Sequence, residues 1–227
     1  MATLPTDKLF KVRNLIEQLV GRFKSVYEPD EVMVVDETMI PFRGRLKLRQ
    51  YIPGKRQNYS VKIFKLCCSR RYTYNLQAYE GTTEKRVMSI GSTVVMDLCK
   101  DYLGQGRNII TDNFYTSLEL SYKLLENKTH SLGTLRANRK GFPKEIVKQK
   151  LKPGEVIGRE NADGIVVMKW SAMKTFQQDA KIEKMRRFIN HDSLFWIITQ
   201  KNLELIYQTN FPGIQHLSEN LLGDTTK

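Results

Sequence analysis

Apolar residues recur every three or four positions in three stretches of the chain, and this spacing places them on one face of an α-helix. We therefore expect helices over residues 7–27, 91–103 and 117–126. Thr6 or Asp7 can cap the first helix, Ser92 the second and Ser117 the third, because their side-chain oxygens accept bonds from the first free N–H groups. Gly104 is expected to end the second helix.

Alternating apolar and polar residues, or short β-branched runs, predict strands around these helices. The expected strands cover residues 31–36, 59–67, 72–79, 107–112 and 130–137. Residues 154–170 are typical of a β-hairpin that turns at 162–164, and the apolar run 193–200 has strand propensity. The order of strands and helices predicts an α/β fold, a mixed sheet flanked by helices with a hairpin inserted at 154–170.

Two of the short apolar strands end in an acid, Asp36 in one and Asp112 in the other. Open α/β sheets carry their functional sites at strand ends, so we expect the two carboxylates on neighbouring strands, roughly 4–7 Å apart. Carboxylates at that distance repel each other unless a divalent cation lies between them, and their hard oxygens suit Mg²⁺. The alternative is that each aspartate only caps the turn after its strand.

Composition narrows the class of protein. With 227 residues and 41% hydrophobic side chains, the chain can form one large domain, or a domain with an appendage. No apolar run reaches the ~18 residues of a membrane helix, and the first residues do not resemble a secretory signal. The three cysteines form no Cys-x-x-Cys pair and the three histidines have no ligand spacing, so neither a disulfide framework nor a zinc site is expected.

Positive charge is concentrated in one part of the chain. The net charge is +13, and residues 43–71 contain ten Lys or Arg and no acid. A strongly basic protein calls for a polyanionic partner, and nucleic acid is the first candidate. Tyr51 and Tyr59 lie within this basic block and could stack on bases, although packing in the core is the expectation we favour for them.

Two longer motifs carry a family resemblance. Residues 34–45 (VVDETMIPFRGR) resemble the first catalytic block of the piggyBac transposases, and residues 108–117 (NIITDNFYTS) resemble the second. Shorter matches follow in family order at residues 50–55, 61–66, 133–143, 154–156 and 167–170. The resemblance implies a ribonuclease H-like core that uses three aspartates and divalent metal to cut and paste DNA at TTAA sites.

Carried onto this chain, the resemblance makes Asp36 and Asp112 catalytic residues that bind Mg²⁺ or Mn²⁺. It implies that the chain binds DNA and lies in the nucleus. A homodimer is possible, and no association with a membrane is expected. Glu37 is expected to be a local hydrogen-bond partner rather than a metal ligand, and Asn113 could position Asp112. The residues expected to follow DNA phosphates are Arg43, Arg45, Lys47, Lys55 and Arg56.

The motif-by-motif resemblance stops after Trp170. The family's third aspartate lies in a Gly-Gly-x-Asp block, and no such block occurs in this sequence. We therefore expect a transposase-like domain over residues 1–170, which is truncated, and a divergent tail over residues 171–227. Asp163 is expected to serve the hairpin turn, whereas Asp179, Asp192 and Asp224 are weak candidates for a replacement ligand.

Three interpretations follow from this break. The first is a transposase-derived DNA-binding protein that is catalytically incomplete, because a second metal ion lacks one anchor. The second is an active transposase or nuclease whose third carboxylate comes from the tail or from a partner subunit. The third is a fragment, or the product of a faulty gene model, without a function of its own.

Overall fold

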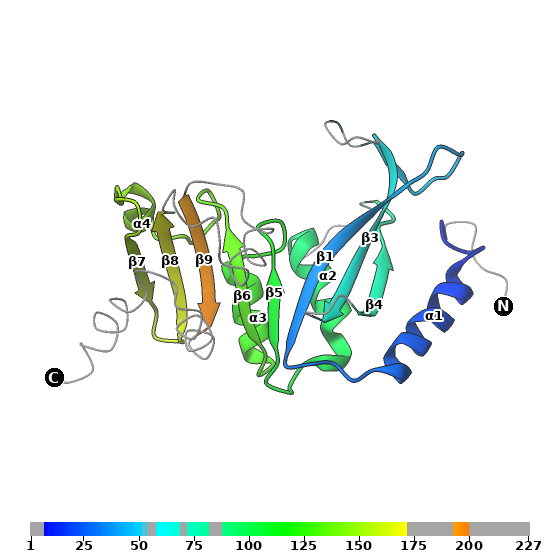
Figure 1. The fold of residues 1–227 in the computed structure, drawn as a ribbon, viewed down its shortest axis with the longest axis horizontal. Coiled ribbons are helices and arrows are strands. Elements are labelled where there is room, and N and C mark those ends of the chain that lie inside the picture. Colours follow the sequence, from blue (N-terminus) through cyan, green and yellow to red (C-terminus); the bar gives the residue numbers. More distant parts are fainter. Residues whose placement is uncertain are drawn as a thin grey trace. The chain divides into compact units, whose positions relative to one another are not determined.

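The computed structural model describes residues 7–51, 53, 58–68, 72–81 and 88–171, together with the backbone of residues 193–199 (Figure 1). The chain divides into two compact units, one ending at Asp101 and the other starting at Tyr102. We describe each unit by itself. The sequence also favours a helix over residues 175–188 and a turn at Arg70 and Arg71 between two strands, and both segments lie outside the described residues.

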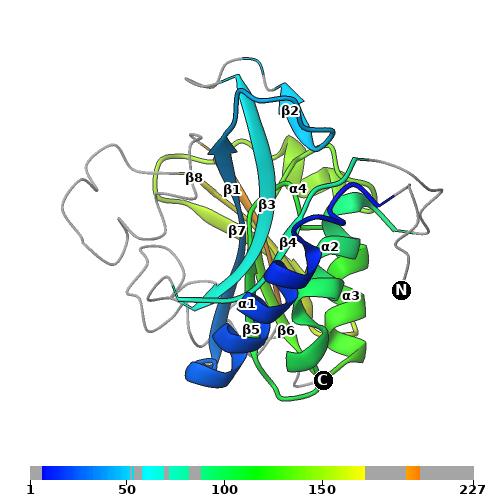
Figure 2. The same ribbon diagram turned by 90° about the vertical axis from the view of Figure 1, so that its right-hand side faces the viewer.

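The first unit is built on the long strand β3. Its elements are α1 (Arg13–Val26), β1 (Val32–Pro41), β2 (Arg49–Tyr51), β3 (Tyr59–Cys68), β4 (Thr73–Ala78), α2 (Ile90–Cys99) and the 3-10 helix η1 (Lys100–Tyr102), where the unit ends. β3 pairs antiparallel with β1 along one edge and with β2 and β4 along the other. Figure 2 shows β2 at one end of β1 and β3, away from the end where α1 lies beside β4.

The strand faces explain how this unit packs. Met33 and Val35 are buried on one face of β1, and Phe64 and Leu66 are buried on β3. Tyr72 ties α1 to the sheet, because its hydroxyl donates to the carbonyl of Phe23 at 2.7 Å. α1 itself has no fully buried residue, so its apolar positions form a half-buried face and an exposed one.

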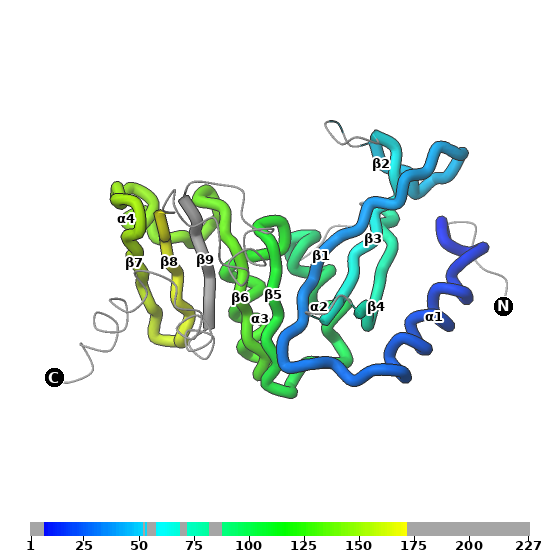
Figure 3. The backbone as a smooth tube through the Cα atoms, in the orientation of Figure 1, coloured from blue at the N-terminus to red at the C-terminus, as the bar shows by residue number. Residues whose placement is uncertain are grey.

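The second unit has a mixed sheet in the order β5-β6-β9-β8-β7. Its elements are β5 (Asn108–Thr111), α3 (Leu118–Glu126), β6 (His130–Leu135), α4 (Lys144–Lys148), β7 (Val156–Glu160), β8 (Ile165–Ser171) and β9 (Ser193–Thr199). The tube in Figure 3 follows the chain from β5 through α3 into β6, which pairs parallel to β5. The pairs β6–β9, β8–β9 and β7–β8 are antiparallel.

The predicted strands and helices are confirmed in the described ranges, and the hairpin is β7 and β8 with its turn at residues 161–164. The apolar run 193–200 also forms its strand, β9, which pairs with β6 on one side and β8 on the other. The division at residue 170 stays a prediction. The helices in the described ranges are all too short or too polar to span a bilayer.

Several boundaries were predicted wrongly. β1 continues through Asp36 to Pro41, because β3 supplies a pairing partner over that whole length, so Asp36 lies within a strand and not at its end. The side chain that caps α2 is Ser89, which accepts the Ser92 N–H, whereas Ser92 is buried in the first turn. Asp7 caps the turns that precede α1, which starts at Arg13, and not the helix itself.

Candidate metal ligands and nucleic-acid interface

Asp112 opens a tight turn directly after β5. Its Oδ1 accepts the N–H of Phe114 at 2.9 Å, and its main-chain oxygen accepts the N–H groups of Tyr115 at 3.2 Å and Thr116 at 3.0 Å. The side chain is half-buried. The backbone of the turn therefore sets the direction in which the carboxylate points.

Two threonines and a glycine support this turn from the side of the sheet. The Thr116 hydroxyl donates to the main-chain oxygen of Asp112 at 2.7 Å and lies 2.8 Å from the Thr111 hydroxyl. Gly133 on β6 stands beside Thr111 in the parallel pair. A Cβ at Gly133 would lie 2.3 Å from the Thr116 hydroxyl oxygen and 2.8 Å from the Thr111 carbonyl oxygen. Only glycine leaves room for the threonine pair.

Arg139 holds the same turn from the other side. Its Nη2 donates to the carbonyl oxygens of Asn113 at 2.9 Å and Phe114 at 2.8 Å, while Arg136 Nε donates to Asn113 Oδ1 at 3.0 Å. Burial and the neighbouring Arg136 lower the pKa of Arg139, and Asp112 opposes this by raising it. Asn113 thus links the turn to Arg136. Both arginines lie in the motif at residues 133–143, but no local pattern in that motif shows that they brace this turn.

Asp36 lies in the middle of β1, on the face opposite to buried Met33 and Val35. The N–H of Glu37 donates to Asp36 Oδ1 at 2.8 Å, and the side chain is half-buried. Glu37 is directed to the other face, where its carboxylate lies 3.9 Å from Lys62 Nζ. This agrees with a local role for Glu37.

Both aspartates suit a hard divalent cation individually. Each carboxylate is half-buried, and a main-chain N–H fixes its orientation, which lowers the cost of ordering it around Mg²⁺ or Mn²⁺. In the described ranges, no three His, Cys, Asp or Glu side chains gather closely enough to hold a metal ion. Asp36 belongs to the first unit and Asp112 to the second, so their expected separation stays a prediction.

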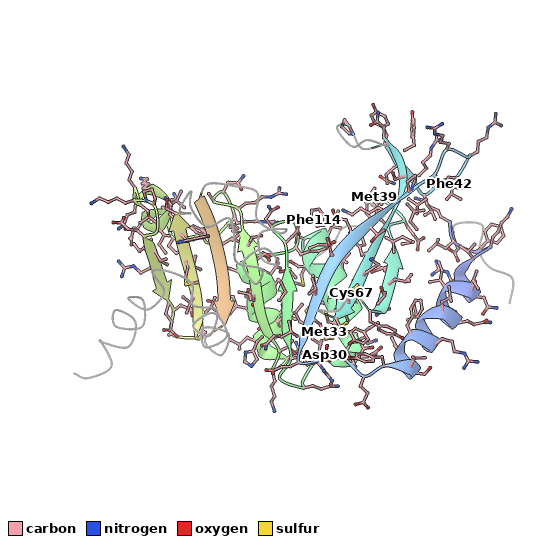
Figure 4. All side chains as sticks on the ribbon, in the orientation of Figure 1. Asp30, Met33, Met39, Phe42, Cys67 and Phe114 are labelled. Atoms are coloured by element: carbon pink, nitrogen blue, oxygen red, sulfur yellow. The ribbon has the colours of Figure 1, made fainter. Side chains whose placement is uncertain are left out.

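A basic and aromatic surface occupies the end of the first unit where β1 turns into β2. We call it the basic-aromatic tip, and it consists of Phe42, Arg43, Arg45, Lys47, Arg49, Tyr51 and Tyr59. Figure 4 labels Met39 and Phe42 at this end of β1, with Asp30 and Met33 at its other end. Arg43, Arg45 and Lys47 are exposed, as phosphate contact requires. Lys55 and Arg56 lie outside the described residues.

Arg49 organises the tip. Its Nη1 donates to the carbonyl oxygens of Arg43 at 3.1 Å and Gly44 at 3.2 Å, which holds the loop after β1 against β2. The guanidinium carbon also lies 4.3 Å from the centre of the Tyr59 ring. Core packing was the favoured expectation for Tyr51 and Tyr59, and it is wrong, because the two residues are 58% and 45% exposed.

Comparison with known proteins identifies the family. The family model described as Transposase IS4 matches residues 2–218, which is nearly the whole chain. The protein is therefore a member of this transposase family, with a mixed α/β, ribonuclease H-like fold. Within the family it belongs to the piggyBac type, as the motifs had suggested. The family match also extends beyond Trp170, where the recognisable motifs stop.

The most informative relatives are piggyBac proteins. The human PiggyBac transposable element-derived protein 3 is 24% identical over 96% of this chain, which spans 39% of that protein. The human Chimeric ERCC6-PGBD3 protein is also 24% identical over 96% of the chain, which spans 22% of it. A piggyBac transposase solved as a synaptic complex with hairpin DNA has a TM-score of 0.73 and 23% identity over 96% of this chain, which covers 45% of that chain.

Proposed function

We propose that this chain is the DNA-binding catalytic-core portion of a piggyBac transposase-derived protein, and that it does not cut DNA by itself. The observation that carries DNA binding is the basic-aromatic tip, where Arg43, Arg45 and Lys47 are exposed. They begin a stretch, residues 43–71, that contains ten Lys or Arg and no acid. The fold match to a transposase solved with DNA supports the same proposal. The chain spans less than half of each of these relatives. Whatever a full-length relative does is therefore attributed to this chain only as a proposal.

Binding through the tip should be electrostatic and largely independent of DNA sequence. Arg43, Arg45 and Lys47 are exposed on a loop, where flexible cations can reach phosphates, and phosphate contacts carry no sequence information. Each phosphate contact releases a counterion, so affinity falls with salt by about 0.9 log units per log unit of salt for each contact on duplex DNA.

The experiment compares two double variants that each remove two positive charges. Arg43→Ala with Lys47→Ala should lower the salt slope on a random duplex by about 1.8, which is two contacts. Lys11→Ala with Arg22→Ala, both exposed in the same unit, should leave the slope unchanged. Equal slopes for all three proteins would show that the tip does not bind the duplex.

We further propose that Asp36 and Asp112 are metal ligands inherited from the transposase core. A divalent ion bound there would supply charge neutralisation and an activated oxygen for phosphoryl transfer. This chain's own contribution is to hold two oriented carboxylates: the Asp112 turn is fixed by Thr116 and Arg139, and Asp36 is fixed by pairing of β1 with β3. The missing Gly-Gly-x-Asp block supports the inactive state, because a third carboxylate is needed to anchor two metals.

A nicking assay on a duplex with TTAA flanks tests this part, with Mg²⁺ or Mn²⁺ and with Asp36→Asn and Asp112→Asn as controls. We expect no cleavage by any of the proteins. Cleavage by the parent chain that both substitutions abolish would refute catalytic incompleteness and favour the active-transposase interpretation. Asp179, Asp192 and Asp224 would then be tested as the replacement ligand.

The remaining parts of the proposal concern location and assembly. A nuclear location is supported by the family and by the positive charge alone. Microscopy of the fluorescently tagged chain would test it. A homodimer is part of the proposal as well, and sedimentation with and without DNA would test it.

A further inference from the structure

We propose that Arg49, Tyr51 and Tyr59 form a stacking platform for an unpaired nucleobase. The proposal rests on the proposed DNA binding and adds a ligand class to it, since it concerns single-stranded rather than duplex nucleic acid. Phosphate contact accounts for Arg43, Arg45 and Lys47. It does not account for two large aromatic side chains exposed beside them.

The platform is built by strand register. Tyr51 on β2 stands directly opposite Tyr59 on β3 in the antiparallel pair. Directly opposed residues project from the same face of a sheet, and the two rings lie 5.1 Å apart between centres at an angle of 58°. Arg49 is two residues before Tyr51, so it projects from this face too. One short strand pair therefore gathers all three side chains.

The geometry leaves aromatic surface for a ligand. Arg49 covers one part of the Tyr59 ring, and its own position is fixed by the carbonyls of Arg43 and Gly44. Tyr51 and Tyr59 remain 58% and 45% exposed. The tilt between the rings makes a corner, in which a flat group can stack on one ring and touch the edge of the other.

The positive charge of the tip favours a negatively charged ligand. The same tip carries exposed Arg43, Arg45 and Lys47, so a flat ligand attached to a negatively charged backbone is favoured over an apolar or cationic protein surface. Bases in a duplex are stacked on their neighbours and present only their edges. An unpaired base offers its face, and any of the four bases can stack on tyrosine.

The test measures binding of a thymidine oligonucleotide and of a duplex of equal length, at one salt concentration and across a salt series. Replacing both tyrosines by leucine, Tyr51→Leu with Tyr59→Leu, keeps apolar bulk but removes the aromatic faces. Removing one base stack costs about 5- to 150-fold in affinity. This variant should therefore bind the single strand at least about 5-fold more weakly than the parent. Its affinity for the duplex and its salt slope should not change.

Replacing both tyrosines by phenylalanine is the matched control, since it keeps both rings and removes only the hydroxyls. This variant should bind the single strand as the parent does. Equal losses for the leucine and phenylalanine variants, or equal losses on single strand and duplex, would overturn the platform. Unchanged single-strand binding by the leucine variant would overturn it too. A parent chain that binds neither DNA would refute the proposed function itself. A parent chain that binds the duplex but not the single strand would refute only the platform.

Discussion

Replacing Gly133 by alanine should destabilise the second unit, because the new methyl group has no room. Its Cβ would lie 2.3 Å from the Thr116 hydroxyl oxygen, 2.7 Å from the Thr111 hydroxyl oxygen and 2.8 Å from the Thr111 carbonyl oxygen. One of these three atoms belongs to the backbone of β5 and cannot rotate away. The parallel pairing of β5 and β6 must therefore widen, or the Thr111–Thr116 hydrogen bond must break.

The expected cost combines two terms. Forcing a methyl group into a packed site costs about 1–3 kcal/mol, and breaking one buried hydrogen bond costs about 1 kcal/mol. Gly133→Ala should therefore lower the free energy of unfolding by about 2–4 kcal/mol. Denaturant unfolding can be followed by tryptophan fluorescence, since both tryptophans of the chain, Trp170 and Trp196, belong to the second unit.

The same substitution elsewhere gives a control of opposite sign. A Cβ at Gly21 in α1 would meet nothing within 4 Å, and Gly21→Ala should stabilise the helix by about 0.5–1 kcal/mol. Circular dichroism measures this effect, because α1 belongs to the first unit and the tryptophans to the second. Combining Gly133→Ala with Thr116→Ala removes the closest contact, so the double variant should lose less stability than the two single variants summed. If Gly133→Ala lowers the free energy of unfolding by less than about 0.5 kcal/mol, the steric reasoning is refuted, because ordinary surface substitutions have effects of that size.

Three further outcomes follow from the described contacts. Arg139→Met should cost about 1–3 kcal/mol in unfolding experiments, because two carbonyls lose their donor, whereas Arg136→Met should cost much less. The hydrogen bond from Arg13 lowers the pKa of Asp7 from 3.8 to about 2. The ionised carboxylate therefore stabilises the fold above about pH 4, and this contribution is lost as the pH falls toward 2. The difference in the free energy of unfolding between the parent and Asp7→Asn should shrink over that interval. Burial raises the pKa of the Cys99 thiol, so a thiol reagent at neutral pH should modify half-buried Cys67 first and reach Cys99 only on unfolding, as mass spectrometry of the labelled peptides would show.

Local pattern predicted the elements because periodicity and capping are local properties. Ser117 caps α3 as expected, and the alternation of residues 59–67 became β3. The true length of β1 could not be predicted in the same way, because it depends on pairing with β3 some 25 residues further along the chain. The short helix α4 was missed, since five residues hold too few turns to show a period.

The sequence predicted the two aspartates of the candidate site, but not the residues that hold the Asp112 turn in place. Asp112 follows β5 as expected, but the contacts that fix its turn come from Gly133 and Arg139, which only the fold of β6 and the loop after it brings close. Similarly, alternation shows that Tyr59 and its neighbours form a strand, but not which face of the strand is covered. The exposure of Tyr51 and Tyr59 could be learned only from their place at the outer end of β3.

The position of β9 has a consequence for synthesis of the chain. β6, β7 and β8 all leave the ribosome before residues 193–199, yet β9 lies between β6 and β8 and pairs with both. Until β9 arrives, one edge of β6 and one edge of β8 present unpaired N–H and C=O groups, which are templates for pairing with other chains. A nascent or shortened chain that ends before residue 193 should therefore aggregate or require a chaperone, and insertion of β9 closes both edges in a single step.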